Sequence, residues 1–330
     1  MVTPAGTILV GTIGQGVMMS GDDGATWTRA SVRVGMHSDA IVKCLLADTR
    51  RPGVVYAGTD LGLYRTEDGG ARWSVLDTPL TGAMVWSVAL DPADSNVLFA
   101  GTGTPSKPGL FRTTDGGKTW EPLAVEIAAE CPNVGTPRPT AIAVDPTDSR
   151  RVWLGLEVDG VRRSTDGGET WTRVAPEIRN PDVHSVLVVA GPPKTVFVLV
   201  NDDVWRSVDD GATFQPVRAR EVFPWHYPRW ITAKPNDDKT VFVTLGDSTP
   251  GRIGALMRSR DAGVTWQSLP LSVQPNSALW TVSVPAALPD TVFAASRYGY
   301  LYRSDDGGET WRKLWREFGE VSSIAWVPGS

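Results

Sequence analysis

The stretch Ser304-Asp305-Asp306-Gly307-Gly308-Glu309-Thr310-Trp311 decides the architecture, because close copies of it recur along the whole chain. Every copy has a Ser or Thr, an Asp two residues later, a Gly after two more and an aromatic residue three further on. The copies occupy residues 20–27, 66–73, 113–120, 164–171, 207–214, 259–266 and 304–311. Their spacing of 43 to 52 residues divides the chain into seven similar units and leaves no room for a second domain. We therefore expect one repeat domain over residues 1–330.

Each unit is predicted to contain four short β-strands. In the third unit, Val88–Leu90 before an Asp-Pro pair is a first strand, Val97–Thr102 a second and Gly109–Arg112 a third. A fourth strand follows the motif, as at Trp171–Val174 in the fourth unit. β-branched and aromatic residues bounded by Gly, Pro and Asp are typical of strands. Only 123–130 has a composition that allows a turn or two of helix. The pattern predicts an all-β fold, a single seven-bladed β-propeller of four-stranded blades.

The two ends of the chain predict how the ring closes. Met1–Thr12 supplies only a second strand before the first motif, and Val321–Pro328 is a first strand with nothing after it. The C-terminal strand is therefore expected to complete the N-terminal blade. Because a closed ring leaves no open sheet edge, we expect that the protein can exist as a monomer.

Composition excludes several classes of protein. With 32 Lys and Arg against 37 Asp and Glu, the net charge is −5, which does not favour nucleic acid as a partner. No apolar run approaches the ~20 residues of a membrane helix. Residues 1–11 lack the basic and apolar segments of a signal peptide, so a cytoplasmic location is expected. Two cysteines, Cys44 and Cys131, and three histidines give no disulfide framework, and their spacing predicts neither a metal nor another cofactor.

The repeated motif predicts a hairpin fastened by its own side chains. The Asp carboxylate can accept the N–H groups of the turn, the Ser or Thr hydroxyls can join this bonding, and Gly supplies a positive φ without strain. The aromatic residue then packs between sheets. Two copies depart from the pattern, with Arg72 in place of Thr and Phe214 in place of Trp. We assign a structural role, not chemistry, to the seven aspartates Asp22, Asp68, Asp115, Asp166, Asp209, Asp261 and Asp306.

This motif resembles the Asp-box, or bacterial neuraminidase repeat, over all seven units. The resemblance implies a propeller similar to those of sialidases, xyloglucanases, sortilin-type receptors, a photosystem II assembly factor and bacterial glycosyl hydrolase-like proteins. It also implies that the boxes lie at the outer edge, away from the ligand face. The Arg-Ile-Pro motif of sialidases is absent near the N-terminus, and the late Arg252-Ile253-Gly254 lacks the Pro. Sialidases have six blades and xyloglucanases two propellers, so neither template fits this single seven-unit chain.

An arginine directly precedes six of the boxes. These repeat positions are predicted to lie on the third strand, where their stems cover the sheet, and they are no evidence for a polyanion site. They are Arg65, Arg112, Arg163, Arg206, Arg258 and Arg303.

Aligning the innermost strands on the Asp-Pro position predicts two tiers of residues around one mouth of the central channel. The deeper tier holds Lys43, Trp86, Thr140, Val186, Arg229, Trp280 and Ser322. The outer tier holds Ile41, Met84, Arg138, His184, Tyr227, Ala278 and Glu320. Residues two apart on a strand share a face, so both tiers face the same way.

Indoles with convergent charges predict a ligand site at this mouth, against the alternative that the residues only fill the channel. The predicted ligand-binding residues are Lys43, Trp86, Arg138, Arg229 and Trp280. Cations there favour a carboxylate or other anion, and the aromatic rings, Tyr227 included, can stack on a sugar.

The loops at the lip of the channel hold further candidates for chemistry. The loop 221–230 is expected to form a stiff functional lip or to plug the channel, and the insertion 123–139, with Cys131, to overhang the same face. Cys131 is more simply an ordinary thiol than a reactive one. A glycosidase needs two carboxylates that flank the bond, and an acid–base site can use His with Tyr. The catalytic candidates are Glu320, Asp39, His184, His226 and Tyr227, with Glu126, Glu130 and Asp182 as further lip carboxylates.

The sequence thus favours a propeller that binds a carbohydrate or a small carboxylate at its top face. A glycoside hydrolase or lyase of the sialidase-like Asp-box group is the first alternative, and a protein-binding assembly scaffold is the second. Paired carboxylates at the mouth would favour the enzyme, and an aromatic and basic ring without such a pair would favour a binding module.

Overall fold

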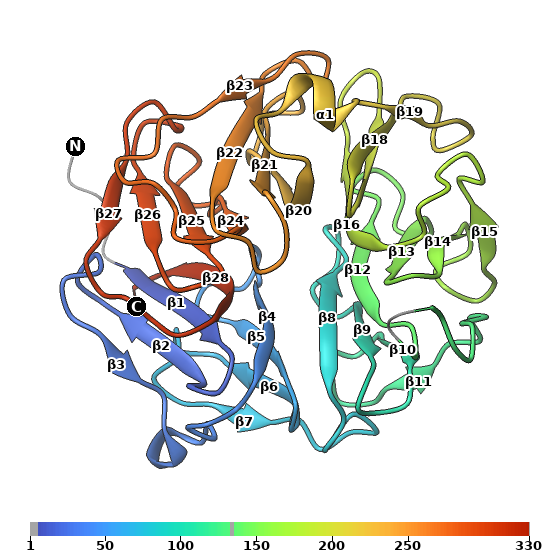
Figure 1. The fold of residues 1–330 in the computed structure, drawn as a ribbon. Coiled ribbons are helices and arrows are strands. Elements are labelled where there is room, and N and C mark those ends of the chain that lie inside the picture. Colours follow the sequence, from blue (N-terminus) through green and yellow to red (C-terminus); the bar gives the residue numbers. More distant parts are fainter. Residues whose placement is uncertain (1–5, 133–134, 330) are drawn as a thin grey trace.

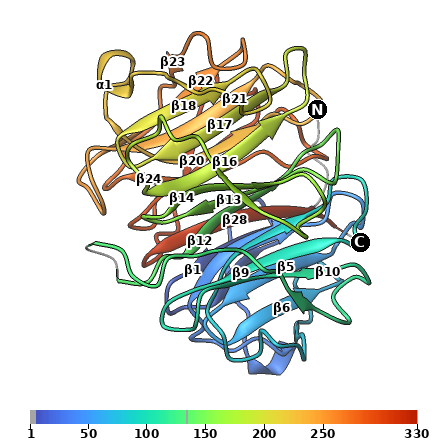
Figure 2. The ribbon, with the colours of Figure 1, turned by 90° about the vertical axis from the view of Figure 1, so that its right-hand side faces the viewer.

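The chain folds into a ring of small sheets around a central axis (Figure 1). A computed structural model describes residues 6–132 and 135–329, and these residues form seven four-stranded sheets. Seen from the side, successive sheets are packed face to face (Figure 2). The predicted all-β, seven-bladed propeller is confirmed.

Within each blade the strands run antiparallel from the channel to the rim. The innermost strands are β28 (Val321–Pro328), β4 (Val42–Ala47), β8 (Val85–Leu90), β12 (Pro139–Val144), β16 (Val183–Val189), β20 (Tyr227–Ala233) and β24 (Leu279–Ser283). The second strands are β1 (Gly6–Thr12), β5 (Val55–Thr59), β9 (Leu98–Thr102), β13 (Val152–Leu156), β17 (Thr195–Val200), β21 (Val241–Gly246) and β25 (Val292–Ser296). The third strands are β2 (Val17–Ser20), β6 (Gly62–Thr66), β10 (Gly109–Thr113), β14 (Gly160–Ser164), β18 (Asp203–Ser207), β22 (Gly254–Ser259) and β26 (Leu301–Ser304). The outermost strands are β3 (Thr28–Arg29), β7 (Ser74–Val75), β11 (Glu121–Pro122), β15 (Thr172–Val174), β19 (Gln215–Pro216), β23 (Gln267–Ser268) and β27 (Arg312–Leu314).

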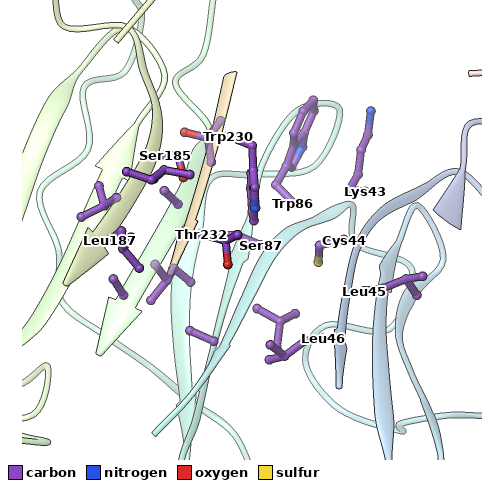
Figure 3. A pocket seen from close by; sticks show the side chains of 18 of the residues that line it. Lys43, Cys44, Leu45, Leu46, Trp86, Ser87, Ser185, Leu187, Trp230 and Thr232 are labelled. Carbon is purple, nitrogen blue, oxygen red and sulfur yellow. The ribbon is translucent and has the colours of Figure 1, made fainter. Parts of the chain in front are cut away.

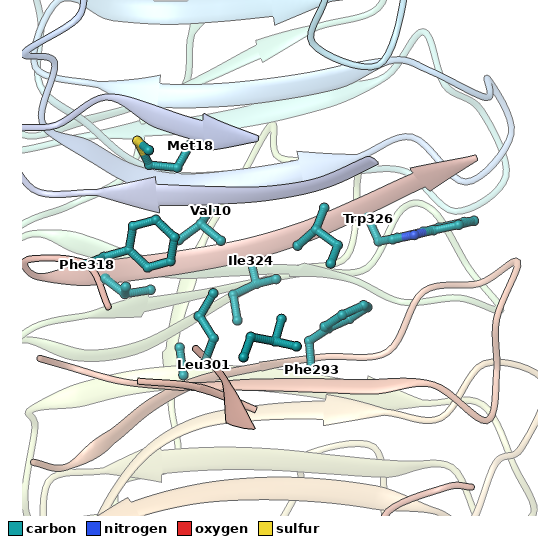
Figure 4. Close-up of a cluster of buried hydrophobic side chains, with 11 residues drawn as sticks. Val10, Met18, Phe293, Leu301, Phe318, Ile324 and Trp326 are labelled. Atoms are coloured by element: carbon teal, nitrogen blue, oxygen red, sulfur yellow. The ribbon is translucent and has the colours of Figure 1, made fainter. Parts of the chain in front are cut away.

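The C-terminal strand closes the ring as predicted. β28 pairs with β1 from Gly6 opposite Pro328 to Thr12 opposite Val321, and the first blade has the order β28-β1-β2-β3. Ile324 and Trp326 of this strand are buried in the same cluster as residues of the last blade, Phe293 among them (Figure 4). Hydrogen bonds of the ladder thus fasten β28 to the first blade, and burial of its apolar side chains fastens it to the last.

The helical content differs from the expectation. Residues 123–130 do not form a helix, because Leu123, Val125 and Ile127 all turn to one hydrophobic cluster. That alternation of every second residue is the period of an extended chain. Two short helices occur instead in the described part, η1 (Val32–Val34) and α1 (Ala219–Val222). No helix among the described residues has the length and apolar character to cross a bilayer.

The box side chains form the hydrogen bonds that the sequence predicts. In all seven boxes the Ser or Thr hydroxyl donates a hydrogen bond to the Asp carboxylate at 2.7–2.9 Å. The same hydroxyl accepts a hydrogen bond from the N–H of the Gly four residues after it, at 2.8–3.0 Å. The residue four after the Asp donates its N–H to the same carboxylate. Where that residue is Thr, its hydroxyl donates as well, a bond that Arg72 cannot reproduce with a hydroxyl.

Consecutive boxes are joined by the arginines that precede them, which the sequence assigned only to covering the sheet. The residue after each box Asp has φ between 54° and 78°. In six of the seven blades the preceding arginine reaches this residue in the next blade. Five contacts end on its main-chain oxygen and the sixth on its carboxylate. The pairs are Arg65–Gly116 (3.3 Å), Arg112–Gly167 (2.7 Å), Arg163–Asp210 (2.8 Å), Arg206–Ala262 (2.6 Å), Arg258–Gly307 (2.7 Å) and Arg303–Asp23 (2.7 Å).

Replacement of Arg258 by Met should destabilise the protein far more than the same change at Arg260. Both arginines pair with Glu309, but the Arg258 side chain is 1% exposed and that of Arg260 63%. Arg258→Met leaves the Gly307 oxygen without its donor and should lower the free energy of unfolding by about 2 kcal/mol. Arg260→Met removes an exposed pair, expected to contribute less than about 1 kcal/mol. Urea unfolding of both variants measures the difference, and equal losses would contradict the inter-blade role.

Acid should weaken the boxes between about pH 4 and pH 2. Hydrogen bonds from Thr170 and Ser164 lower the pKa of Asp166 from its ordinary 3.8 to about 2. A depressed pKa stabilises the fold fully above the unfolded value, and the stabilisation is lost as the pH falls through the folded value. Asp166→Asn should therefore lower the melting temperature at pH 7, and the gap to wild type should narrow toward pH 2. Glu130→Gln, an exposed change, is the control. A gap that stays constant with pH would count against this account.

Candidate functional site

A cavity of about 760 Å3 runs along the innermost strands at the centre of the ring. Figure 3 shows part of it, with Lys43 and Trp86 at one end and Cys44 and Leu46 deeper along β4. At the end of the cavity where Lys43 lies, the lining comes from the starts of the innermost strands and from loops that follow the second strands. We call this end the mouth.

Every innermost strand has a β-bulge at its start. The pairing with the second strand skips one residue in each blade, for instance between Val42 and Cys44. All seven skipped residues line the cavity. They are Lys43, Trp86, Thr140, His184, Arg229, Trp280 and Ser322. A bulge re-aims a side chain and is a recurrent device near functional sites.

The bulges correct one blade of the sequence alignment. His184, predicted for the outer tier, is the bulged residue of β16 and stands with Lys43 and Arg229. Val186, predicted for that position, pairs regularly with Val198 further along the strand. No Asp-Pro pair follows β16, and a shift of two residues preserves the hydrophobic alternation, so periodicity alone could not detect the error.

Cations outnumber carboxylates at the mouth. Lys43, Arg138, Arg229 and Arg297 line the cavity there, and Glu157 is the one carboxylate among the described residues that line this end. Arg138 pairs with Glu157 at 2.6 Å. Arg297 pairs with Glu320, a predicted catalytic candidate that is not itself part of the lining. Lys43 and Arg229 have no ion-pair partner within 4 Å among residues 6–132 and 135–329.

The two mouth tryptophans each hold a pair of these cations. Lys43 Nζ lies 4.2 Å and Arg138 Cζ 4.7 Å from the Trp86 ring centroid. Arg229 Cζ and Arg297 Cζ lie 4.3 and 4.4 Å from the Trp280 centroid. An aromatic face attracts cations, so the rings that were expected to stack on a ligand instead position guanidinium and ammonium groups. The result is an aromatic and basic ring at the mouth.

Burial and the neighbouring cations also change the pKa of Lys43. Burial, together with the nearby charges of Arg297 and Arg138, lowers the pKa of the Lys43 ammonium from 10.5 to about 8. Removal from water disfavours the charged form, and like charges add to that effect.

His184, Tyr227 and Asp182 form a second polar group. The Nδ1 of His184 lies 2.8 Å from the Pro228 carbonyl oxygen, which can only accept, so Nδ1 carries a proton. Its Nε2 faces the Tyr227 hydroxyl at 3.5 Å and Asp182 Oδ2 at 3.7 Å. Burial raises the pKa of Asp182, but its hydrogen bond to His184 and the neighbouring charge bring the pKa below the usual range. Burial also raises the pKa of Tyr227, which keeps the hydroxyl protonated.

Several other predicted residues do not line this cavity. Asp39 is exposed and pairs with Arg29 of the outermost strand β3, and His226, Glu126 and Glu130 are not part of the lining. Among the described residues, no group of three or more His, Cys, Asp or Glu side chains is arranged to hold a metal ion.

The predicted lip loop 221–230 has a different role. Phe223 packs edge-on against Trp266 at 5.3 Å, within a core cluster that Trp225 also joins. Phe223 and Trp225 therefore neither plug the channel nor form a free lip. Only its last part, with Tyr227, Arg229 and Trp230, reaches the cavity.

The two cysteines are both free thiols. Burial raises the pKa of Cys44 to about 12 and also raises that of Cys131. Neither thiol is activated as a nucleophile. Part of the insertion that contains Cys131, residues 133–134, lies outside the described residues.

Sequence reasoning missed two mouth residues, Glu157 and Arg297. Each immediately follows a second strand, β13 or β25, where the repeat position holds Asp60, Gly103 or Asn201 in other blades. A comparison of this position across the seven units would have found the signal, because the residue there varies from unit to unit and the loops that follow the second strands lie at the same end of the ring.

Comparisons with known proteins agree with this architecture. A family model described as BNR/Asp-box repeat matches residues 111–122, 162–173 and 302–313, the third, fourth and seventh boxes. The xyloglucanase of Hypocrea jecorina (strain QM6a) is 26% identical over 291 residues, which cover 74% of this chain and 34% of that protein. The chain thus spans about a third of the length of this curated relative.

Solved structures show the same fold. The GH74 enzyme of Niastella koreensis superimposes with a TM-score of 0.67 at 23% identity, over 82% of this chain and 45% of that one. The structure of YCF48 bound to D1 peptide has a TM-score of 0.58 at 16% identity, over 88% of this chain and 94% of that one. The protein is a seven-bladed β-propeller with Asp-box repeats, similar to the propellers of glycoside hydrolases.

Proposed function

We propose that the protein binds a carboxylate-bearing carbohydrate at the mouth of the central channel. The observation that carries the proposal is the set of four cations that face a single lining carboxylate. Arg229 and Lys43 have no counter-ion among the described residues, and the Nε of Arg229 is buried without a hydrogen-bond partner there. A buried donor without a partner costs free energy that a ligand carboxylate would recover through charge-assisted hydrogen bonds.

Binding fits the mouth better than hydrolysis does. A glycosidase flanks the bond with two carboxyl groups, one of which stays protonated near neutral pH. Glu157 is engaged by Arg138 and Glu320 by Arg297. The pKa of Asp182 is lowered, which is opposite to what a general acid requires. These carboxylates are therefore neutralised by the protein rather than aimed at a ligand.

The relatives support a carbohydrate as the ligand. The curated relatives are xyloglucanases, which act on a polysaccharide, and this chain matches about a third of their length. Sugar acids combine the ring surface of such ligands with the negative charge that the mouth favours.

Peptide binding is the second candidate. YCF48, whose length this chain nearly matches, has been solved with the D1 peptide bound. A single propeller of this size can thus act as a binding module without a second domain. A peptide ligand for this chain would also have to present a carboxylate, because the cation excess is the same.

Galacturonate oligomers should bind, and Arg229→Ala should weaken binding at least about tenfold. Loss of one charge-assisted hydrogen-bond partner costs about 1.5–3 kcal/mol, which corresponds to that factor or more. Isothermal titration calorimetry measures the affinity. Arg260→Ala is the matched control, since its side chain is 63% exposed and lies in the sixth box, outside the cavity lining.

Neutral glucose oligomers test the charge requirement in the same experiment. Equal binding of neutral and acidic oligomers, or equal affinities of the two arginine variants, would rule out an anion site at the mouth. A carboxylate-containing peptide that binds where the sugar acids do not would select the second candidate.

A further inference from the structure

Lys43 differs from the structural lysines of this chain in its surroundings. It is the bulged residue of β4 and projects at the mouth, with Nζ against the face of Trp86 (Figure 3). Structural lysines of this chain have carboxylate partners, as Lys194 has Asp145 at 2.6 Å and Lys234 has Asp290 at 2.7 Å. Lys43 has none within 4 Å in the described part of the chain.

Burial and the neighbouring charges make the neutral form of Lys43 more accessible than that of an ordinary lysine. The charged groups that act on it come from four other blades, and three of the four are positive. They are Arg138, Arg229, Arg297 and Glu320. Glu320 is itself neutralised by Arg297, so little negative charge is left to hold a proton on the amine. With its pKa lowered to about 8, Lys43 at neutral pH has far more free amine than an exposed lysine.

Arg138 lies close enough to cooperate with this amine. Lys43 Nζ and Arg138 Cζ both contact Trp86, so they cannot lie further apart than the sum of their two distances to its centroid. A ligand of a few carbon atoms that is held through a carboxylate can therefore present its carbonyl carbon to Lys43. A desolvated lysine beside other cations is a recurrent form of imine-forming nucleophile.

We propose that Lys43 forms an imine with the carbonyl carbon of a ligand that also carries a carboxylate. Such ligands are 2-oxo acids and the open-chain form of uronic acids. The neutral amine attacks the carbonyl carbon, a C–N bond forms, and the carbonyl π electrons move to oxygen. The oxygen then leaves as water with both amine protons, and a C=N bond remains. The inference rests on the proposed anion site, because the arginines hold the ligand's carboxylate.

Reductive trapping tests the proposal. The intact protein is incubated with glyoxylate, or with galacturonate, and sodium cyanoborohydride, and peptide mass spectrometry follows the adduct at each lysine. Lys43 should be labelled at least about tenfold faster than the exposed Lys118 at pH 7, because more of it is neutral. The advantage should shrink above pH 8 and should fall in Arg229→Ala. Lys118→Arg is the matched control and should leave the adduct at Lys43 unchanged.

The decisive comparison is made within one wild-type chain, so it does not depend on whether a Lys43→Arg variant folds. Labelling of Lys43 no faster than that of Lys118 would overturn the imine. Thermal stabilisation by lactate, a carboxylate without a carbonyl, reports the anion site separately. Stabilisation without selective labelling would leave the proposed function standing and reject only the imine.

Discussion

The hydrogen bond from each box-preceding arginine to the next box is the contact on which the ring depends. A propeller blade cannot bury both faces alone, so its stability comes from its neighbours. The positive φ after each box Asp is part of the turn that ends in this contact. Carboxylate, turn and arginine therefore form a belt around the rim that is interrupted between the first and second blades, where Met19 stands in place of arginine. There Met19 packs against the hydrophobic cluster that the first two blades share.

The sequence predicted this belt only in part. The seven boxes and their internal hydrogen bonds could be predicted because they involve residues close in sequence. The closing strand could be predicted because the first and the last unit each lack strands that the other supplies. The arginine contacts did not, although all six arginines were recognised as repeat positions. Five of them join residues about 50 positions apart, as Arg163 joins Asp210, and Arg303 joins the last box to Asp23 near the start of the chain. Pairing over such separations depends on how the blades stack. Burial of Arg258 and Arg303 likewise depends on the adjacent blade and not on their own strand.

The mouth was predictable to the extent that its residues keep a fixed place in the repeat. Lys43, Trp86, Arg229 and Trp280 were found because an Asp-Pro pair or regular spacing fixed their register. His184 was misplaced by two residues, since its strand lacks that marker and alternation is unchanged by such a shift. Pairing between side chains was beyond reach altogether. Arg229 and Arg297 both contact the Trp280 ring, but they come from different blades, and only the folded chain brings them together.

The two ends of the blades therefore serve different requirements. At the rim, the Ser or Thr hydroxyl and the Asp carboxylate of each box have hydrogen-bond partners within the chain, and the same residue types recur in all seven repeats. At the mouth, one bulge per blade releases a side chain from the ladder, and its identity varies from Ser to Trp. Cations gathered at one place repel one another and lose hydration, which opposes folding. A site of this kind persists only in a scaffold stabilised elsewhere, and departures from local rules are concentrated at functional positions. The belt of arginines at the rim supplies that stability, which is why the like charges at the mouth can remain together.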